Sequence, residues 1–265
     1  MNQPDSTGYA AAAGVAVYWE SRGHGGPPLV VVHGGFGLTT MFGDLLDEWA
    51  VDRQVVAIEL QGHGHTRDVD RPLRWETLGD QVAGVVDTLG LGPADLLGYS
   101  LGGGASLRAV ITHPDRFRRV VLVATTHRRD ASYPEVLAAM DQVGSAGFAM
   151  MSQSPMYRAW SAVAPDPDAF PTLMDKAGEL LRQPYDWSAE IRGVTAPTML
   201  VYGDADSVPP SAAAEFFALL GGGLGDPGWD GAVGAGHRLA VLPGRTHYDV
   251  LAAPLLGAVV ADFLA

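Results

Sequence analysis

Short, uninterrupted runs of apolar residues alternate along this chain with longer stretches in which apolar positions recur every three or four residues. The short runs are rich in β-branched residues, as expected for strands buried on both faces of a parallel sheet. The longer stretches have the spacing of amphipathic helices. The alternation is typical of βαβ units and predicts an α/β fold, with a mostly parallel central β-sheet flanked by helices. The predicted strands are 15–19, 29–32, 54–60, 95–97, 119–124, 198–202 and 239–242, and the predicted helices are 39–50, 77–89, 101–112, 211–220 and 252–264.

The pattern changes between residues 127 and 194, where no run has the character of a buried strand. Prolines divide this stretch into short helical segments, and it contains five of the eight methionines together with several aromatic residues. Such side chains suit a soft, apolar inner surface. We therefore expect a core formed by residues 1–126 and 195–265, with a helical cap (or lid) of residues 127–194 inserted between core strands.

One pentapeptide, Gly98-Tyr99-Ser100-Leu101-Gly102, lies between a predicted strand and a predicted helix. A G-x-S-x-G sequence places its serine on a sharp, strained turn, and side chains at the two glycine positions would collide with the turning backbone. The serine oxygen then stands at the carboxyl edge of the sheet, with the positive end of the helix behind it. Ser100 is therefore the candidate nucleophile.

A serine hydroxyl is a poor nucleophile at neutral pH, and it needs a base within hydrogen-bond reach that is itself oriented by a third group. His247 lies in a loop between the last predicted strand and the last predicted helix, which makes it the candidate base. Asp206 and Asp204 both follow the predicted strand 198–202 and are the candidates for the acid.

These motifs, in this order, resemble the α/β-hydrolase superfamily over nearly the whole chain. The resemblance rests on the His33-Gly turn, the serine pentapeptide, G-x-x-D at 203–206 and P-G-x-x-H at 243–247. It implies an α/β-hydrolase fold that works without a cofactor, and it favours Asp206 as the triad acid because Pro209 follows it. Asp204 is the rival, and it could instead brace the loop.

Cleavage through a tetrahedral intermediate needs backbone N–H groups aimed at the oxyanion. The resemblance implies Leu101 as one donor and Gly35 as the other, with Phe36 as the alternative because this turn has an extra glycine. His33 is expected to brace the same turn by hydrogen bonds. The candidate residues of the substrate pocket are Phe36, Tyr99, Met151 and Trp160.

The sequence His63-Gly-His65-Thr-Arg-Asp68 superficially suggests a dinuclear metal site. The pattern H-x-H-x-D-H of such sites is not met, and no further histidine cluster completes a ligand set. The resemblance implies a structural turn instead, in which Glu59 and Thr66 replace the usual aspartate and serine. We therefore expect no metal.

Thirty acidic residues against 17 basic residues give a formal net charge of −13. This acidity argues against nucleic acids and anionic membranes as partners, because both need a positive surface. The absence of cysteine excludes disulfides, thiolate catalysis and cysteine-ligated metals. With no visible secretion signal and no run long enough to span a bilayer, we expect a cytoplasmic protein, a monomer or homodimer.

The sequence thus predicts a serine hydrolase that cleaves carboxylic ester or lactone bonds, macrolide-type esters included, through an acyl-enzyme intermediate. Its partner would be a small-molecule ester or lactone. A serine at the turn between strand and helix argues against dehalogenases and epoxide hydrolases, which use an aspartate at that position. The alternatives are other triad chemistry on the same fold (a C–C hydrolase, a perhydrolase or an aminopeptidase) and a non-catalytic small-molecule receptor.

Overall fold

Eight strands form one sheet in the computed structural model, which describes residues 2–226, 228–229 and 236–265. The strands are β1 (Ser6–Ala12), β2 (Val15–Arg22), β3 (Leu29–Val32), β4 (Val55–Glu59), β5 (Ala94–Tyr99), β6 (Phe117–Val123), β7 (Thr198–Ala205) and β8 (Arg238–Thr246). Their spatial order is β1-β2-β4-β3-β5-β6-β7-β8. All pairings from β4 to β8 are parallel, whereas β2 is antiparallel to both of its neighbours. The prediction of a mostly parallel sheet is confirmed.

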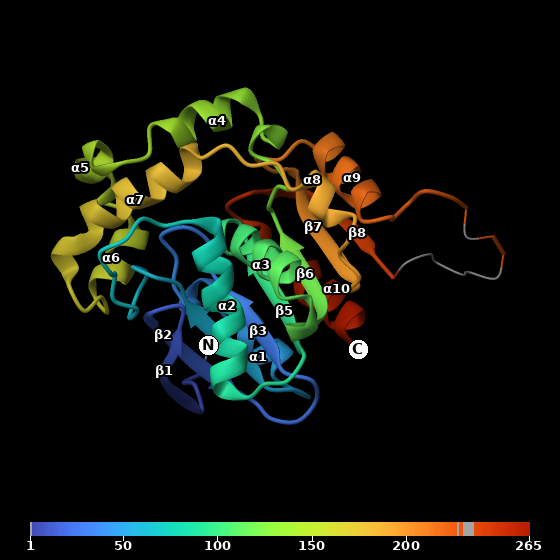
Figure 1. Cartoon of the computed structure of the whole chain (residues 1–265), viewed down its shortest axis with the longest axis horizontal. Helices are drawn as coiled ribbons and strands as arrows, with labels where there is room; N and C mark the ends of the chain where they lie inside the picture. The colour runs from blue at the N-terminus through green and yellow to red at the C-terminus, as the bar shows by residue number, and fades with distance from the viewer. Residues whose placement is uncertain (1, 227, 230–235) are drawn as a thin grey trace.

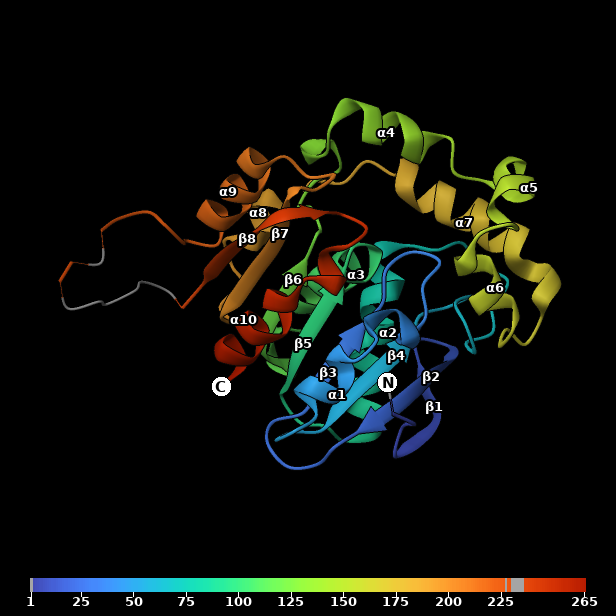
Figure 2. The same cartoon turned by 180° about the vertical axis from the view of Figure 1, so that it is seen from behind.

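Helices cover both faces of this sheet (Figures 1 and 2). One face carries α2 (Trp75–Leu89), α3 (Leu101–Thr112) and α9 (Pro210–Leu219), and the other carries α1 (Leu45–Trp49) and α10 (Pro254–Leu264). Short 3₁₀ helices complete the chain, namely η1 (Thr39–Phe42), η2 (Pro114–Arg116), η3 (Arg129–Ala131), η4 (Ser145–Gly147), η5 (Pro167–Ala169) and η6 (Val250–Ala252).

Strand β3 shows why the apolar runs are uninterrupted. Its four residues are fully buried, and successive side chains of a strand point to opposite faces. Val30 and Val32 pack into the core with α2 and α3, whereas Leu29 and Val31 pack into the core with α1 and α10. Because both faces are covered, every position of such a strand has to be apolar.

The structure differs from the expected elements at two places. β1 has no strand-like sequence pattern and exists because it pairs along its whole length with β2 at the edge of the sheet. The predicted helix 39–50 is divided into η1 and α1, because Gly43 adopts a positive φ of 54° that a continuing helix does not allow.

Between β6 and β7 the chain forms the helices α4 (Pro134–Asp141), α5 (Phe148–Met151), α6 (Pro155–Ser161), α7 (Phe170–Arg182) and α8 (Ser188–Ile191). Most of this segment arches over one edge of the sheet (Figures 1 and 2). Its two ends pair with each other, because Arg128 and Asp186 form an antiparallel bridge and Trp187 N–H donates to the His127 carbonyl at 3.0 Å. The segment therefore leaves and rejoins the core at one place.

Two contacts tie the far side of this segment to the loop after β4. The indole N–H of Trp160 donates to the Gly62 carbonyl at 3.0 Å. Lys176 Nζ on α7 donates to Asp68 Oδ2 at 2.6 Å and to the Val69 carbonyl at 2.7 Å. The Lys176 and Asp68 side chains are only 16% and 20% exposed, so this ion pair is largely shielded from water.

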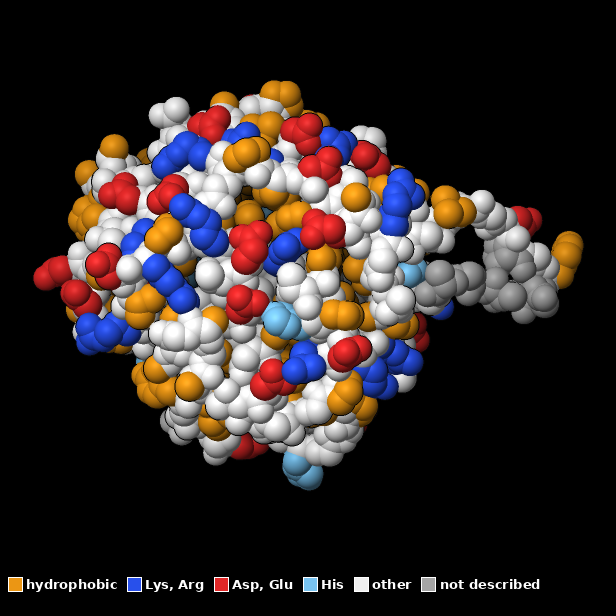
Figure 3. Space-filling view, in the orientation of Figure 1, with side chains coloured by type: hydrophobic (Ala, Val, Ile, Leu, Met, Phe, Trp, Pro, Cys, Tyr) orange, Lys and Arg blue, Asp and Glu red, His pale blue; other side chains and the backbone are white. Residues whose placement is uncertain are grey.

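Charges of both signs are interspersed over the face shown in Figure 3. Several basic side chains on the surface are already paired, for example Arg108 with Glu190 and Arg116 with Asp87, both at 2.7 Å. Within the described ranges, no helix combines the length and the apolarity needed to cross a bilayer.

Replacing Lys176 by Met should loosen the segment 127–194, because it removes a shielded ion pair and leaves Asp68 partly buried without its cation. We expect the free energy of unfolding to fall by about 1–3 kcal/mol, measured by urea unfolding, and thermolysin to cut within the segment faster. Glu179→Gln is the matched control. It breaks the neighbouring pair with Arg74, whose side chains are 51% and 37% exposed, and should change stability by less than about 0.5 kcal/mol. Equal effects of the two substitutions would contradict the assignment.

Candidate functional site

The junction of β5 and α3 presents Ser100 at the carboxyl edge of the sheet. Ser100 has φ 53° and ψ −117°, a conformation that non-glycine residues rarely adopt. A Cβ at Gly98 would collide with Ser106 and with the Gly102 carbonyl, and a Cβ at Gly102 would collide with the His33 carbonyl. The two glycines therefore permit the strained turn that the pentapeptide predicts.

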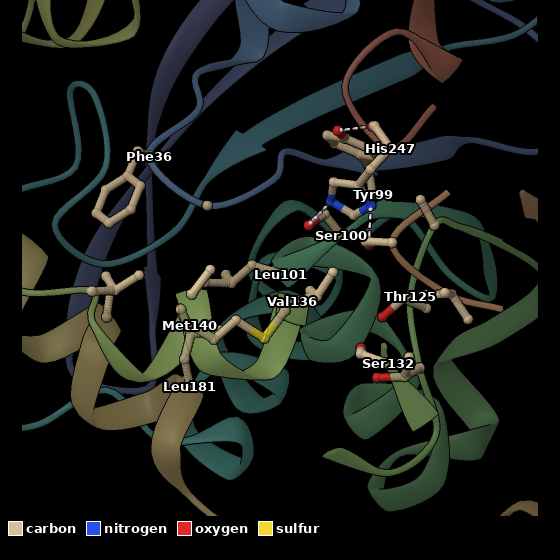
Figure 4. Close-up of a pocket in the computed structure, with 18 of the residues that line it drawn as sticks. Phe36, Tyr99, Ser100, Leu101, Thr125, Ser132, Val136, Met140, Leu181 and His247 are labelled. Carbon is tan, nitrogen blue, oxygen red and sulfur yellow. Dashed lines mark hydrogen bonds between the residues drawn. The ribbon is translucent and has the colours of Figure 1, made fainter. Parts of the chain in front are cut away.

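The structure brings Ser100, His247 and Asp206 together from three separate loops. Ser100 Oγ lies 3.0 Å from His247 Nε2 (Figure 4). His247 Nδ1 lies 2.9 Å from Asp206 Oδ1. The Asp206 side chain is fully buried, whereas the His247 side chain is 16% exposed. Asp204 does not join this chain of hydrogen bonds, because its carboxylate accepts from the Gly244 N–H at 2.8 Å and so braces the turn of β8.

Tyr99, the residue directly before Ser100, holds the loop that carries His247. Tyr99 O–H donates to the His247 carbonyl at 2.6 Å, and the two rings lie 5.6 Å apart. Burial raises the pKa of Tyr99, so its hydroxyl stays protonated and remains a donor. Tyr99 therefore fixes the position of the His247 loop and also lines the cavity described below.

Ser207 is a functional candidate that the sequence analysis missed. Its Oγ lies 2.9 Å from His247 Nδ1 and donates to Asp206 Oδ1 at 3.2 Å. The Nδ1–H group of His247 therefore has two oxygen acceptors rather than one. No motif marks this position, although its place directly after the candidate acid was a signal that could have found it.

The turn after β3 faces the start of α3. Gly35 lies close to Leu101, since a Cβ added at Gly35 would be 3.6 Å from the Leu101 side chain. Leu101 is the first residue of α3, so its N–H has no partner inside the helix. Neither Gly35 N–H nor Phe36 N–H has a hydrogen-bond partner among the described residues, so both remain available as donors. Phe36 has φ 56°, a left-handed conformation at this turn.

His33 braces this turn from below. Its Nδ1 lies 2.7 Å from the Gly34 carbonyl, and its Nε2 accepts from the Leu60 N–H at 3.0 Å. Only a neutral ring with a proton on Nδ1 satisfies both contacts. Burial lowers the pKa of His33 to about 3, so the ring is neutral at physiological pH and has no role as a proton carrier.

The histidines of the loop after β4 serve different partners. His65 donates from Nδ1 to the buried Glu59 carboxylate at 2.9 Å, whereas His63 Nδ1 contacts the Gln61 carbonyl at 3.0 Å. Asp68 pairs with Lys176. In the part of the chain that the structure describes, no three His, Cys, Asp or Glu side chains form a group suited to a metal ion.

A cavity of about 480 Å³ opens above Ser100, between the strand ends and the helices α4 to α7. Phe36, Tyr99 and Met151 line it, as does His247. Trp160 does not line this cavity, which corrects the expectation from the sequence. Trp160 is 2% exposed and packs on Phe170 of α7, with ring centroids 4.9 Å apart, while its indole N–H bonds the Gly62 carbonyl of the core.

Comparisons with known proteins agree with this architecture. A family model described as alpha/beta hydrolase fold matches residues 27–221. Over 129 residues the chain is 34% identical to 2-hydroxymuconate semialdehyde hydrolase from Pseudomonas sp. (strain CF600). The matched stretch covers 47% of this chain and 45% of that protein. Over 111 residues it is 39% identical to a pimeloyl-[acyl-carrier protein] methyl ester esterase from Neisseria meningitidis, 41% of each protein. The chain thus spans less than half the length of these curated relatives.

The structure of a thermophilic esterase from Thermogutta terrifontis superimposes with a TM-score of 0.72 at 19% identity, covering 99% of this chain and 98% of that one. At this identity the similarity concerns the fold.

Removing the Ser207 hydroxyl should take away a contact that supports His247 when its ring gains a proton. Because Ser207 accepts a share of the Nδ1–H bond, it stabilises the charged ring, and Ser207→Ala should lower kcat by about 2- to 10-fold. Ser207→Thr retains the hydroxyl and should restore most of the lost kcat, which separates the loss of this contact from a general disturbance of the loop. An Ala variant with an unchanged kcat would contradict this role.

The Glu59–His65 pair should make stability depend on pH. Hydrogen bonding to Glu59 raises the pKa of His65 above its usual 6.5. A raised pKa adds stability that is fully present below the unfolded value and is lost as the pH rises through the folded value. His65→Gln should therefore destabilise the protein more at about pH 5.5 than at about pH 8.5, by on the order of 0.5 kcal/mol because the ring is partly exposed. Urea unfolding at both pH values checks this, and an equal loss at both would exclude the linkage.

Proposed function

Since the chain belongs to the alpha/beta hydrolase fold family, we propose that it is a serine hydrolase that cleaves carboxylic ester or lactone bonds. The observation that carries the proposal is the continuous hydrogen-bond chain from Ser100 Oγ through His247 to Asp206, with contacts of 3.0 and 2.9 Å. This is the spacing that general-base activation of a serine needs.

In the first half of the reaction, Ser100 Oγ attacks the carbonyl carbon of the substrate while His247 Nε2 takes the hydroxyl proton. Asp206 holds His247 with its proton on Nδ1, so that Nε2 is free to accept, and it stabilises the positive ring that forms. The tetrahedral intermediate then collapses, and His247 gives its proton to the departing alkoxide. The products of this half are an alcohol and an acyl group on Ser100.

In the second half, water takes the place of the alcohol. His247 removes a proton from the water as the water oxygen attacks the acyl carbon, and the same proton returns to Ser100 Oγ when the ester bond breaks. A carboxylic acid leaves, and the starting state is restored. With a lactone, the alcohol and the acid remain in one molecule.

Negative charge that develops on the carbonyl oxygen has donors nearby. Leu101, Gly35 and Phe36 line the cavity together with Ser100, and their N–H groups lack protein partners among the described residues. The N-terminus of α3 points its positive end to the same place. Such donors lower the barrier to acyl transfer strongly, because they are already oriented and need no rearrangement during the reaction.

The segment 127–194 acts in this proposal as a cap that shields the acyl-enzyme and shapes the substrate site. The cavity beneath it has the size of a small-molecule site and is lined largely by apolar side chains. Met140, Met151 and Met156 contribute to this lining, and methionine adapts to irregular shapes. An ester or lactone with a medium-sized apolar portion fits this description.

The names of two relatives set the alternatives to be tested. One similar protein is a methyl ester esterase, which favours ester cleavage, and another is 2-hydroxymuconate semialdehyde hydrolase. The same triad serves other hydrolytic chemistry, so the substrate panel has to include the compound in the second name.

The test compares the wild type with Ser100→Ala on p-nitrophenyl esters of short and medium chain length, on simple and macrocyclic lactones and on 2-hydroxymuconate semialdehyde. Ser100→Ala should lower kcat by about 10⁴-fold or more. A folded wild-type protein without turnover on any member, and without labelling of Ser100 by a fluorophosphonate, would favour the receptor alternative.

The same substitution at Asp206 and at Asp204 tests which of the two is the acid of the triad. Asp206→Asn should lower kcat by about 10³- to 10⁴-fold, because the amide no longer holds the required tautomer of His247. Asp204→Asn should change kcat by less than about 3-fold, since among the described residues the Asp204 carboxylate accepts only from the Gly244 N–H. The reverse ranking would move the role of the acid to Asp204.

A further inference from the structure

We propose that Thr125 and Ser132 form a hydrogen-bonding subsite beside Ser100, and that the preferred ester carries a neutral hydroxyl or carbonyl group on one side of its scissile carbonyl and an apolar chain on the other. The inference rests on the proposed function and specifies the substrate class of the same cavity.

Both residues are buried, yet their hydroxyl groups face the cavity without a partner. Thr125 is 6% exposed and Ser132 is 9% exposed, and both line the cavity. Neither hydroxyl has a hydrogen-bond partner within the described ranges of the chain. The Thr125 backbone is fixed, because its carbonyl accepts from Tyr202 O–H at 2.8 Å. The backbone that carries the Thr125 hydroxyl is therefore held in place, while the hydroxyl itself remains without a protein partner.

The neighbouring hydroxyl groups are different. Thr126 Oγ1 and Tyr185 O–H lie 2.8 Å apart and satisfy each other. Hydroxyl groups shielded from bulk water are nearly always hydrogen-bonded, either to the protein or to an ordered water. A substrate that supplies a partner for Thr125 and Ser132 replaces the water that would otherwise do so, whereas an isosteric apolar substrate displaces that water and offers nothing in return.

The polarity of the cavity changes across Ser100. Figure 4 shows Thr125 and Ser132 together on one side of Ser100, and Phe36, Leu101 and Met140 on the other. An ester bound at Ser100 thus has a polar wall on one side and an apolar wall on the other.

The recognised group is neutral rather than anionic. Arg129 is the cation that borders the cavity in the part of the chain that the structure describes, and it is already engaged. Its Nε donates to the Leu181 carbonyl at 2.8 Å, and a terminal nitrogen pairs with Asp141 at 2.5 Å. Glu135 also borders the cavity and would repel a carboxylate. The hydroxyl groups of Thr125 and Ser132 can donate or accept, which suits a hydroxyl or a carbonyl.

The experiment uses ester pairs in which a hydroxyl replaces a methyl group. p-Nitrophenyl 3-hydroxybutanoate is compared with p-nitrophenyl 3-methylbutanoate to probe the acyl side, and 2-hydroxyethyl butanoate is compared with propyl butanoate to probe the alcohol side. The wild type should prefer the hydroxyl member of one pair by about 3- to 10-fold in kcat/KM. The pair that shows the preference identifies which part of the ester occupies the subsite.

The double variant Thr125→Val/Ser132→Ala should abolish this preference by lowering kcat/KM for the hydroxyl ester, while turnover of the methyl or propyl ester stays within about 3-fold of the wild type. Thr126→Val is the matched control, because it removes a cavity hydroxyl that already has a partner, and it should leave the preference intact. Thermal unfolding of each variant shows that it is folded.

Two negative results are distinguishable. Absence of Ser100-dependent turnover on all four esters, together with absence of Ser100 labelling by a fluorophosphonate, would refute the proposed function itself. Turnover on all four without a hydroxyl preference, or with a preference that survives in the double variant, would overturn the subsite while the proposed function stands.

Discussion

The site depends on how closely the start of α3 approaches the sheet. Three successive glycines make this possible, because a Cβ at Gly102 would collide with the His33 carbonyl, one at Gly103 with the Thr125 side chain and one at Gly104 with the Trp75 ring. Any larger residue would move α3 outward and carry Ser100 with it. The strained conformation of Ser100 persists because this packing on both sides of the turn over-determines it.

The same close approach organises the groups around Ser100. It places Leu101 against Gly35, and it places Thr125 next to the glycine face of α3. Strands β5, β6, β7 and β8 are parallel neighbours, so the loops after them meet at one edge and bring Ser100, Thr125, Asp206 and His247 together. The partly buried hydrogen bond from Tyr99 to the His247 carbonyl then couples the loop of His247 to the strand that leads to Ser100.

The segment over this edge has two kinds of attachment, and they suggest different tasks. At its ends, the segment pairs with itself through its backbone, and the rings of Tyr185 and Trp187 pack on Trp75 of α2, with centroids 5.4 and 5.7 Å away. On the far side, Trp160 and Lys176 hold it through a few polar contacts to one loop. The ends are positioned by cooperative packing, whereas the far side rests on contacts that can break singly.

The sequence by itself determined the α/β fold and three polar positions near its carboxyl edge. Buried parallel strands need uninterrupted apolar runs, and a sharp strand-to-helix turn needs glycine on both sides of Ser100, so both leave local signals. The order of Asp206 and His247 after later strands was also readable, and the structure brings these side chains to Ser100.

Only the tertiary structure decided what no local pattern records. β1 exists through pairing with β2, the contact of Ser207 with His247 depends on two loops far apart in the chain, and Trp160 turned away from the cavity to bond Gly62. The choice between Asp204 and Asp206 was likewise a matter of side-chain direction. The unpartnered hydroxyl groups of Thr125 and Ser132 became visible only when every neighbouring donor and acceptor had been placed, because hydrogen-bond satisfaction is a property of the whole packed fold.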